Sequence, residues 1–154
     1  MSAVVEEGRA APDFELKSDT GETVRLSSLR GRPVVLYFYP KDETPGCTTQ
    51  ACGIRDAYAA FRENGAVVLG VSPDDEASHA SFRQKYSLPF ALLADPGRVA
   101  GEAYGVIRED SEYYERSTFV IAPDGTVAKV MRRVNPETHA AEVLATLSGL
   151  SSRG

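Results

Sequence analysis

The sequence Pro33-Val34-Val35-Leu36-Tyr37-Phe38-Tyr39 carries the strongest structural signal in this chain. Its β-branched and aromatic residues follow one another without polar alternation, which is typical of a central strand covered on both faces. Residues 40–52 read Pro-Lys-Asp-Glu-Thr-Pro-Gly-Cys-Thr-Thr-Gln-Ala-Cys and open a helix that Asn64-Gly65 ends. The helix buries a stripe at helical spacing, formed by Ala51, Ile54, Tyr58 and Phe61. A buried strand that leads directly into a helix indicates an α/β protein.

Further strands and helices are expected on both sides of this unit. The strand-like segments are Phe14–Leu16, Thr23–Leu26, Ala66–Val71, Phe90–Ala94, Thr118–Ala122 and Thr126–Met131. The helical segments are one turn at Leu26–Gly31, then Glu76–Tyr86, a short helix from Asp95-Pro96 to about Tyr104, and Pro136–Leu147. Turn residues at Ser18–Gly21 and Pro123–Gly125 predict two hairpins.

The order of these elements predicts the topology. Alternating strands and helices imply parallel pairing with right-handed crossovers, and the late hairpin adds an antiparallel edge. We therefore expect an α/β protein that resembles the thioredoxin-like fold, with a mixed central sheet, helices on both faces and an N-terminal β-hairpin. No repeat or low-complexity linker divides residues 1–154, so the prediction is a single domain.

Composition excludes several classes of function. The chain has 154 residues, 42% hydrophobic and 25% charged, which is enough for a core without disulfide support. A net charge of -5 argues against nucleic acid or an anionic membrane as a partner. No apolar run approaches the ~20 residues of a membrane span, and the N-terminus lacks the features of a signal peptide. A cytoplasmic location is expected, where transient disulfides are usually catalytic or sensing.

Cys47 and Cys52 are the whole cysteine content of the chain. Five residues of an α-helix advance ~7.5 Å along the axis and ~140° around it, which separates the two Cα atoms by ~8.7 Å. A disulfide needs Cα atoms closer than ~7 Å. If these cysteines join, the helix between them must unwind, which suggests a redox device with two conformations.

The position of Cys47 favours the thiolate. Thr44 is a plausible N-cap and Pro45 suits the first helical position, so Gly46 and Cys47 fall where backbone N–H groups have no helical partner. Raising a free thiol from ~3% to ~90% thiolate at pH 7 requires about 3.4 kcal/mol, whereas a helix terminus supplies at most ~2 kcal/mol. A second source is needed. The Thr44 hydroxyl is one candidate, and Arg116, which immediately precedes an apolar strand, is another.

These residues carry a resemblance. The segment Tyr37–Cys52 is similar to the active-site segment of a peroxiredoxin, most closely of the bacterioferritin comigratory protein or peroxiredoxin Q subfamily. The family pattern Pro-x-x-x-Thr-x-x-Cys falls on Pro40, Thr44 and Cys47, and the resemblance extends from about Ala11 to Leu147. Between Gly105 and Arg116 the chain departs from it, because many members have a longer stretch rich in lysine and glycine. That departure bears on substrate preference and on reductant docking.

The resemblance implies a role for each residue. Cys47 would be the peroxidatic nucleophile that becomes a sulfenic acid, and Cys52 would be the resolving cysteine that forms a disulfide with it. Thr44 and the backbone N–H groups of Gly46 and Cys47 would orient the peroxide. Arg116 would stabilise the thiolate and the breaking O–O bond, and Pro40 would shield the pocket from water. The expected substrates are hydrogen peroxide and organic hydroperoxides, the expected reductant is thioredoxin or a similar dithiol protein, and the expected state is a monomer without cofactor.

Two other functions remain open. A thioredoxin-type disulfide oxidoreductase suits the fold, although the C-x-x-C motif is missing. A peroxide-sensing interaction protein suits a helix that unwinds on oxidation. Insulin reduction would favour the first, and a partner that distinguishes the two redox states would favour the second.

Other polar residues have simpler interpretations. No metal site is expected, since His79 and His139 lack ligand spacing and are interpreted as helix-surface residues. Asp74-Asp75-Glu76 is interpreted as a solvated first turn of a helix, and Lys41-Asp42-Glu43 as a solvated loop. Tyr37 and Tyr39 are assigned to the core or the pocket wall.

Overall fold

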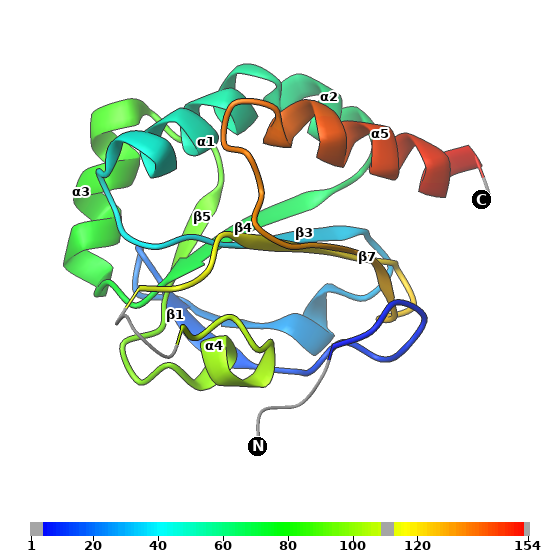
Figure 1. Cartoon of the computed structure of the whole chain (residues 1–154), viewed down its shortest axis with the longest axis horizontal. Coiled ribbons are helices and arrows are strands. Elements are labelled where there is room, and N and C mark those ends of the chain that lie inside the picture. Colours follow the sequence, from blue (N-terminus) through cyan, green and yellow to red (C-terminus); the bar gives the residue numbers. More distant parts are fainter. Residues whose placement is uncertain (1–4, 109–112, 153–154) are drawn as a thin grey trace.

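A seven-stranded mixed sheet in the order β2-β1-β5-β4-β3-β6-β7 forms the centre of the protein (Figure 1). The computed structural model describes residues 5–108 and 113–152. Its strands are β1 Glu15–Ser18, β2 Thr23–Arg25, β3 Val34–Phe38, β4 Val67–Ser72, β5 Ala91–Ala94, β6 Ser117–Ile121 and β7 Val127–Met131. Its helices are the 3₁₀ turn η1 Leu26–Leu29, α1 Pro45–Asp56, α2 Tyr58–Glu63, α3 Glu76–Tyr86, α4 Val99–Ala103 and α5 His139–Ser152.

The sheet separates two apolar clusters. In β3, Val34, Leu36 and Phe38 face one cluster, and Val35 and Tyr37 face the other. This explains why the strand is apolar throughout, because both of its faces are buried. Figure 1 shows α1, α2 and α5 along one side of the sheet and α4 on the other side. The predicted helices on both faces and the N-terminal hairpin are confirmed.

The pairing of β3 places the two parts of the site at one end of the sheet. It runs parallel to β4 and antiparallel to β6, with Phe38 opposite Ser117. The residue after β3 therefore lies across from the residue before β6. Because α1 follows β3 through a short loop, its first turn lies beside Arg116.

Three helices differ from the expected boundaries. The helix predicted to run to Asn64 is divided at Ala57, whose N–H contacts the carbonyls of both Gly53 and Ile54 and tightens the chain there. The helix expected from Asp95 begins instead at Val99. The residues between Asp95 and Val99 form a turn, and the Asp95 carboxylate accepts the N–H of Val99.

The last helix, α5, starts three residues later than expected, at His139, since Pro136–Thr138 form a turn before it. It also runs further, to Ser152. Within the described ranges, no helix combines the length and the apolar character that a membrane crossing requires.

Gly70 lies so close to its neighbours that a side chain there would collide with them. A Cβ there would lie 2.8 Å from the ring of Tyr37 and 2.9 Å from Leu92, and both neighbours are buried. We expect Gly70→Ala to lower the free energy of unfolding by about 1–3 kcal/mol, because the packed core cannot absorb the methyl group. Urea denaturation measures it. Gly97→Ala, whose Cβ would meet only Val99 at 3.8 Å, is the control, and equal losses in both variants would contradict the prediction.

Candidate active site

The site begins at the first turn of α1. Thr44 is the N-cap by its backbone angles and Pro45 occupies the first helical position. The first helical hydrogen bond runs from Thr48 N–H to the Thr44 carbonyl, so the N–H groups of Gly46 and Cys47 lie before it. The Thr44 hydroxyl makes no capping bond and instead donates to the carbonyl of Lys41 at 3.0 Å. It therefore does not donate to the cysteine sulfur in this conformation.

Cys47 lies beneath this turn and beside Arg116. Its side chain is 1% exposed and packs in the cluster between α1, α5 and the sheet. The Arg116 Nη1 donates to the Cys47 Sγ at 3.5 Å. A helix start and a guanidinium thus both place positive charge beside the same sulfur.

Gly46 makes the approach of Arg116 possible. A Cβ at this position would lie 2.8 Å from Arg116 Nη2. Any side chain would therefore push the guanidinium away from Cys47. The pattern Pro-x-x-x-Thr-x-x-Cys leaves position 46 open, and the steric reason for a glycine there is visible only in the structure.

Arg116 is held by a second group. Its Nη1 donates to the Gln50 Oε1 at 2.7 Å. The Gln50 Nε2 lies 3.3 Å from His139 Nδ1, and His139 Nε2 lies 2.7 Å from the Thr118 hydroxyl. The prediction that His139 lies on a helix surface is wrong, because its side chain is fully buried at the start of α5. Burial, reinforced by the charge of Arg116, lowers the pKa of His139 to about 4.

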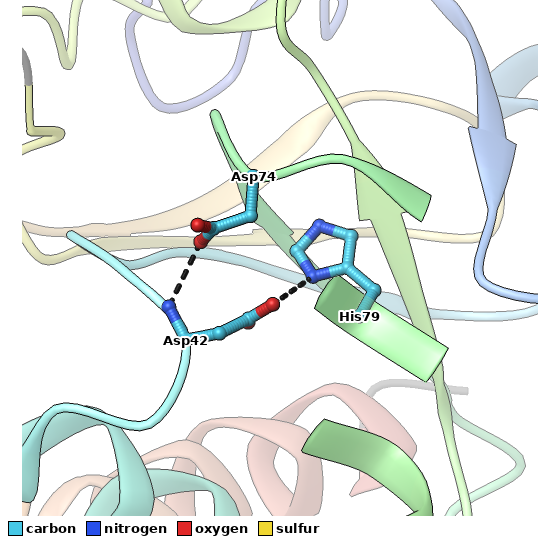
Figure 2. A group of neighbouring side chains, drawn as sticks. All are labelled: Asp42, Asp74 and His79. Carbon is cyan, nitrogen blue, oxygen red and sulfur yellow. Dashed lines mark hydrogen bonds and ion pairs between the residues drawn. The ribbon is translucent and has the colours of Figure 1, made fainter. Parts of the chain in front are cut away.

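A second buried network fixes the loop between β3 and α1 (Figure 2). The Asp42 carboxylate accepts from the Tyr39 hydroxyl at 2.6 Å and from the Ser78 hydroxyl at 2.8 Å, and it lies 2.7 Å from His79 Nδ1. The Asp42 N–H donates to Asp74 at 2.8 Å. Ser78 and His79 thereby tie the loop to α3, and Asp74 ties it to the segment before that helix.

These contacts correct three further expectations. Asp42 is 6% exposed rather than solvated, and His79 is fully buried rather than on a helix surface. Asp74 is half-buried and accepts the Ser72 hydroxyl at 2.6 Å. Asp75 and Glu76 are exposed at the first turn of α3, as expected. Tyr37 and Tyr39 are buried in the core, as expected.

Asp42, Asp74 and His79 present ligand atoms within 4.8 Å of one another. The hydrogen bonds account for them without a metal ion. His79 Nε2 faces the Leu93 carbonyl at 2.9 Å, and its Nδ1 faces Asp42. The two ring nitrogens are thus occupied by the Asp42 carboxylate and the Leu93 carbonyl. This arrangement is that of a buried acid–imidazole pair.

An open cavity of about 590 Å³ adjoins Arg116. It is lined by Pro40, Arg108, Tyr114, Glu115, Arg116 and Arg133. Pro40 is half-buried at its edge. Of the stretch between Gly105 and Arg116, residues 109–112 lie outside the described residues, and the flanks pair through Ile107 and Tyr114.

Cys52 lies on α1, half-buried, and is not bonded to Cys47. Both cysteines belong to one continuous helix, whose geometry keeps them too far apart for a disulfide.

The sequence offered a signal for both buried histidines. His79 precedes Phe82 and Tyr86 by three and seven residues, which places it on the buried face of α3. His139 precedes Val143 and Leu147 by four and eight residues, on the buried face of α5. Gln50 has the same relation to Ile54 on α1. Helical periodicity could have identified all three.

Comparisons with known proteins agree with this geometry. The model of the AhpC/TSA family matches residues 8–130. The chain is 46% identical over 155 residues to peroxiredoxin Bcp of Bacillus subtilis, covering 97% of this chain and 99% of that protein. It is 46% identical to the chloroplastic peroxiredoxin Q of Oryza sativa subsp. japonica, over 95% of this chain and 68% of that protein.

A solved structure is similar throughout. The bacterioferritin comigratory protein of Xanthomonas campestris, whose structure was described with reference to its alkyl peroxide reduction activity, superposes with a TM-score of 0.87 at 34% identity. The match covers 94% of this chain and 98% of that one. The expected thioredoxin-like peroxiredoxin fold is therefore confirmed.

We expect the buried Asp42–His79 pair to contribute strongly to the stability of the fold. Asp42→Ala leaves a buried imidazole and the Tyr39 hydroxyl without their partner, so we expect the free energy of unfolding to fall by about 3–5 kcal/mol. Lys85→Ala is the control, because it breaks only an exposed, solvent-screened pair with Glu43 and should leave the free energy of unfolding nearly unchanged. Chemical denaturation measures both, and a loss below about 1 kcal/mol for Asp42→Ala would refute the prediction.

Proposed function

This chain belongs to the AhpC/TSA family, and from that premise we propose that it is a thiol-dependent peroxidase whose peroxidatic residue is Cys47. The contact that carries the proposal is the 3.5 Å approach of Arg116 Nη1 to the Cys47 Sγ at the start of α1. A guanidinium over a helix-start thiol stabilises the nucleophile and the charge that develops on the departing peroxide oxygen.

In the oxidation step, the Cys47 thiolate attacks the terminal oxygen of the peroxide. The O–O bond breaks, the peroxide is reduced to water or an alcohol, and the sulfur becomes a sulfenic acid. Thr44 orients the substrate. Because its hydroxyl hydrogen is directed to the Lys41 carbonyl, its oxygen lone pairs are available to accept the peroxide O–H. The N–H groups of Gly46 and Cys47 and the Arg116 guanidinium donate to the peroxide oxygens, and Pro40 restricts water at the pocket edge.

In the resolving step, the Cys52 thiolate attacks the Cys47 sulfenic sulfur, the S–S bond forms, and the sulfenic oxygen leaves as water. The helix between the two residues unwinds first, because a helix holds their Cα atoms ~8.7 Å apart. A dithiol protein of the thioredoxin kind then reduces the disulfide. The resolving cysteine is in the same chain, so a monomer completes the cycle.

The composition of α1 favours this unwinding. Its twelve residues include Gly46, Thr48, Thr49 and Gly53, which are poor helix formers. What retains the helix is its buried face, formed by Cys47, Gln50, Ala51 and Ile54. A helix held by packing rather than by propensity opens locally at a low free energy.

The substrates proposed are hydrogen peroxide and organic hydroperoxides. The X. campestris relative is associated by name with alkyl peroxide reduction. The proposed location is the cytoplasm, although the rice relative is named as chloroplastic.

Substitution of each cysteine tests the cycle. Cys47→Ser should abolish the turnover of hydrogen peroxide with thioredoxin and its reductase. Cys52→Ser should keep the first reduction of peroxide, because the nucleophile is intact, but lose the recycling by thioredoxin. Mass spectrometry of the oxidised protein should show a Cys47–Cys52 linkage in the wild type and Cys47 sulfinic acid in Cys52→Ser. Full turnover by Cys47→Ser would overturn the proposed function, and an oxidised wild type without the linkage would overturn the two-cysteine cycle.

Gly53→Ala tests the unwinding. The new Cβ meets only Ala140 at 3.9 Å, so the substitution stabilises α1 by about 1 kcal/mol through helix propensity. We expect disulfide formation to slow about fivefold and sulfinic acid to accumulate at high peroxide, while the first oxidation of Cys47 keeps its rate. Stopped-flow kinetics with mass analysis measures both steps.

Gly149→Ala is the matched control for this experiment. It makes the same change in α5, where a Cβ has no neighbour within 4 Å. Disulfide formation in this variant should keep the wild-type rate. If Gly53→Ala raises the hydrogen-exchange protection of α1 without slowing the disulfide, unwinding does not limit the resolving step.

A further inference from the structure

In the series of hydrogen bonds that starts at Arg116, each group is the donor to the next group. A guanidinium has only donors, so the Gln50 atom at 2.7 Å from Arg116 is the amide oxygen. The amide nitrogen then faces His139 Nδ1, which must accept and so carries no proton. In a neutral imidazole the proton is then on Nε2, which donates to the Thr118 oxygen at 2.7 Å. Each group donates to the next, from Arg116 through Gln50 and His139 to Thr118.

The direction of these hydrogen bonds depends on Thr118, at the other end of the series, as well as on Arg116. If His139 carried its proton on Nδ1, two donors would meet at the Gln50 amide nitrogen. The amide would then turn and present its NH₂ group to Arg116, where again two donors would meet. The Thr118 oxygen prevents this, because it is the acceptor that holds the imidazole proton on Nε2.

We propose that His139 and Thr118 are positioning residues for Arg116, since they fix the Gln50 amide with its oxygen towards the guanidinium that contacts Cys47. The inference rests on the proposed function for the role of Arg116 in the reaction. The proposed support for Arg116 comes from His139 at the start of α5 and from Thr118 in strand β6.

The surroundings of His139 suit this role. Gln50, Thr118 and His139 are each at most 1% exposed, so water does not replace a lost partner. The charge that acts on the imidazole is that of Arg116. The ring of Tyr37 packs against the imidazole, with 5.9 Å between the two ring centroids. Burial and the Arg116 charge keep the pKa of His139 near 4, which maintains the neutral ring that the hydrogen bonds require.

Substitution of His139 tests the proposal with two readouts. His139→Leu removes the acceptor, so we expect the rate constant for oxidation of Cys47 by hydrogen peroxide to fall about tenfold, as for a displaced catalytic group. Alkylation of Cys47 by iodoacetamide at pH 7 should slow in the same variant, because a displaced guanidinium stabilises less thiolate. His139→Asn should restore much of both rates, because the asparagine oxygen occupies the place of Nδ1.

Alkylation needs no peroxide chemistry. It therefore tests the positioning of Arg116 even if the proposed peroxidase function fails. Val143→Ala is the packing control, one turn along the same buried face of α5. It should reduce stability but leave the alkylation rate of Cys47 unchanged.

Two further variants separate positioning from packing. Thr118→Val leaves the Gln50 and Arg116 side chains themselves unchanged, yet it should slow both reactions of Cys47, because it releases the imidazole proton from Nε2. In a Gln50→Leu background, His139→Leu should add less than about a twofold loss, since the amide that it orients is gone.

Three results would overturn the proposal. Folded His139→Leu could keep the wild-type rates of Cys47 oxidation and alkylation, or His139→Asn and His139→Leu could lower these rates equally. The third is a double variant of Gln50 and His139 whose loss of rate equals the product of the two single losses. Should His139→Leu not fold, Thr118→Val decides, and wild-type rates in that variant overturn the proposal.

Discussion

An arginine side chain can only donate hydrogen bonds, and this constraint orders the polar groups around Cys47. The antiparallel pairing of β3 and β6 brings Arg116 to the end of the sheet where α1 begins. There its Nη1 meets two acceptors, the Cys47 sulfur and the Gln50 oxygen. The fold thus supplies a fixed cation at a helix start. The helix start adds the partial positive charge of its free N–H groups beside the same sulfur.

The same helix builds the site and takes it apart. Gln50 lies on α1 between Cys47 and Cys52, and its amide is part of what holds Arg116. In the proposed cycle the helix unwinds to join the cysteines, and Gln50 then leaves its partners together with Cys47. On that proposal the conformation that reacts with peroxide and the conformation that forms the disulfide exclude each other. A sulfenic acid in the folded helix would stay exposed to a second peroxide, so the proposal makes the stability of α1 the quantity that sets the balance between recycling and over-oxidation.

Sequence patterns predicted the sheet and the first turn of α1, because apolar periodicity and helix-start residues act locally. The approach of Arg116 to Cys47 spans 69 positions, and it was predicted from its place before an apolar strand and from the family resemblance. Sequence patterns did not predict the buried roles of Asp42, His79 and His139. Their partners lie far along the chain, because Asp42 and His79 are separated by 37 positions and Gln50 and His139 by 89. A polar residue on an apolar face gives a periodic signal, but the partner that makes its burial tolerable comes from the tertiary fold.

The two buried networks differ in strength, and the difference sets the limits of the unwinding. Asp42 is held by an imidazole and two hydroxyls, and breaking such a buried pair costs several kcal/mol. The Gln50 contact to His139 is a neutral hydrogen bond at 3.3 Å and contributes about 0.5–1.5 kcal/mol net. On the far side, Ile54 is fully buried in the core. In the proposed resolving step, Asp42 and Ile54 anchor the two ends of the segment that unwinds. Residues 43–53, which hold both cysteines and Thr44, would then open between these anchors while Arg116 stays on the sheet.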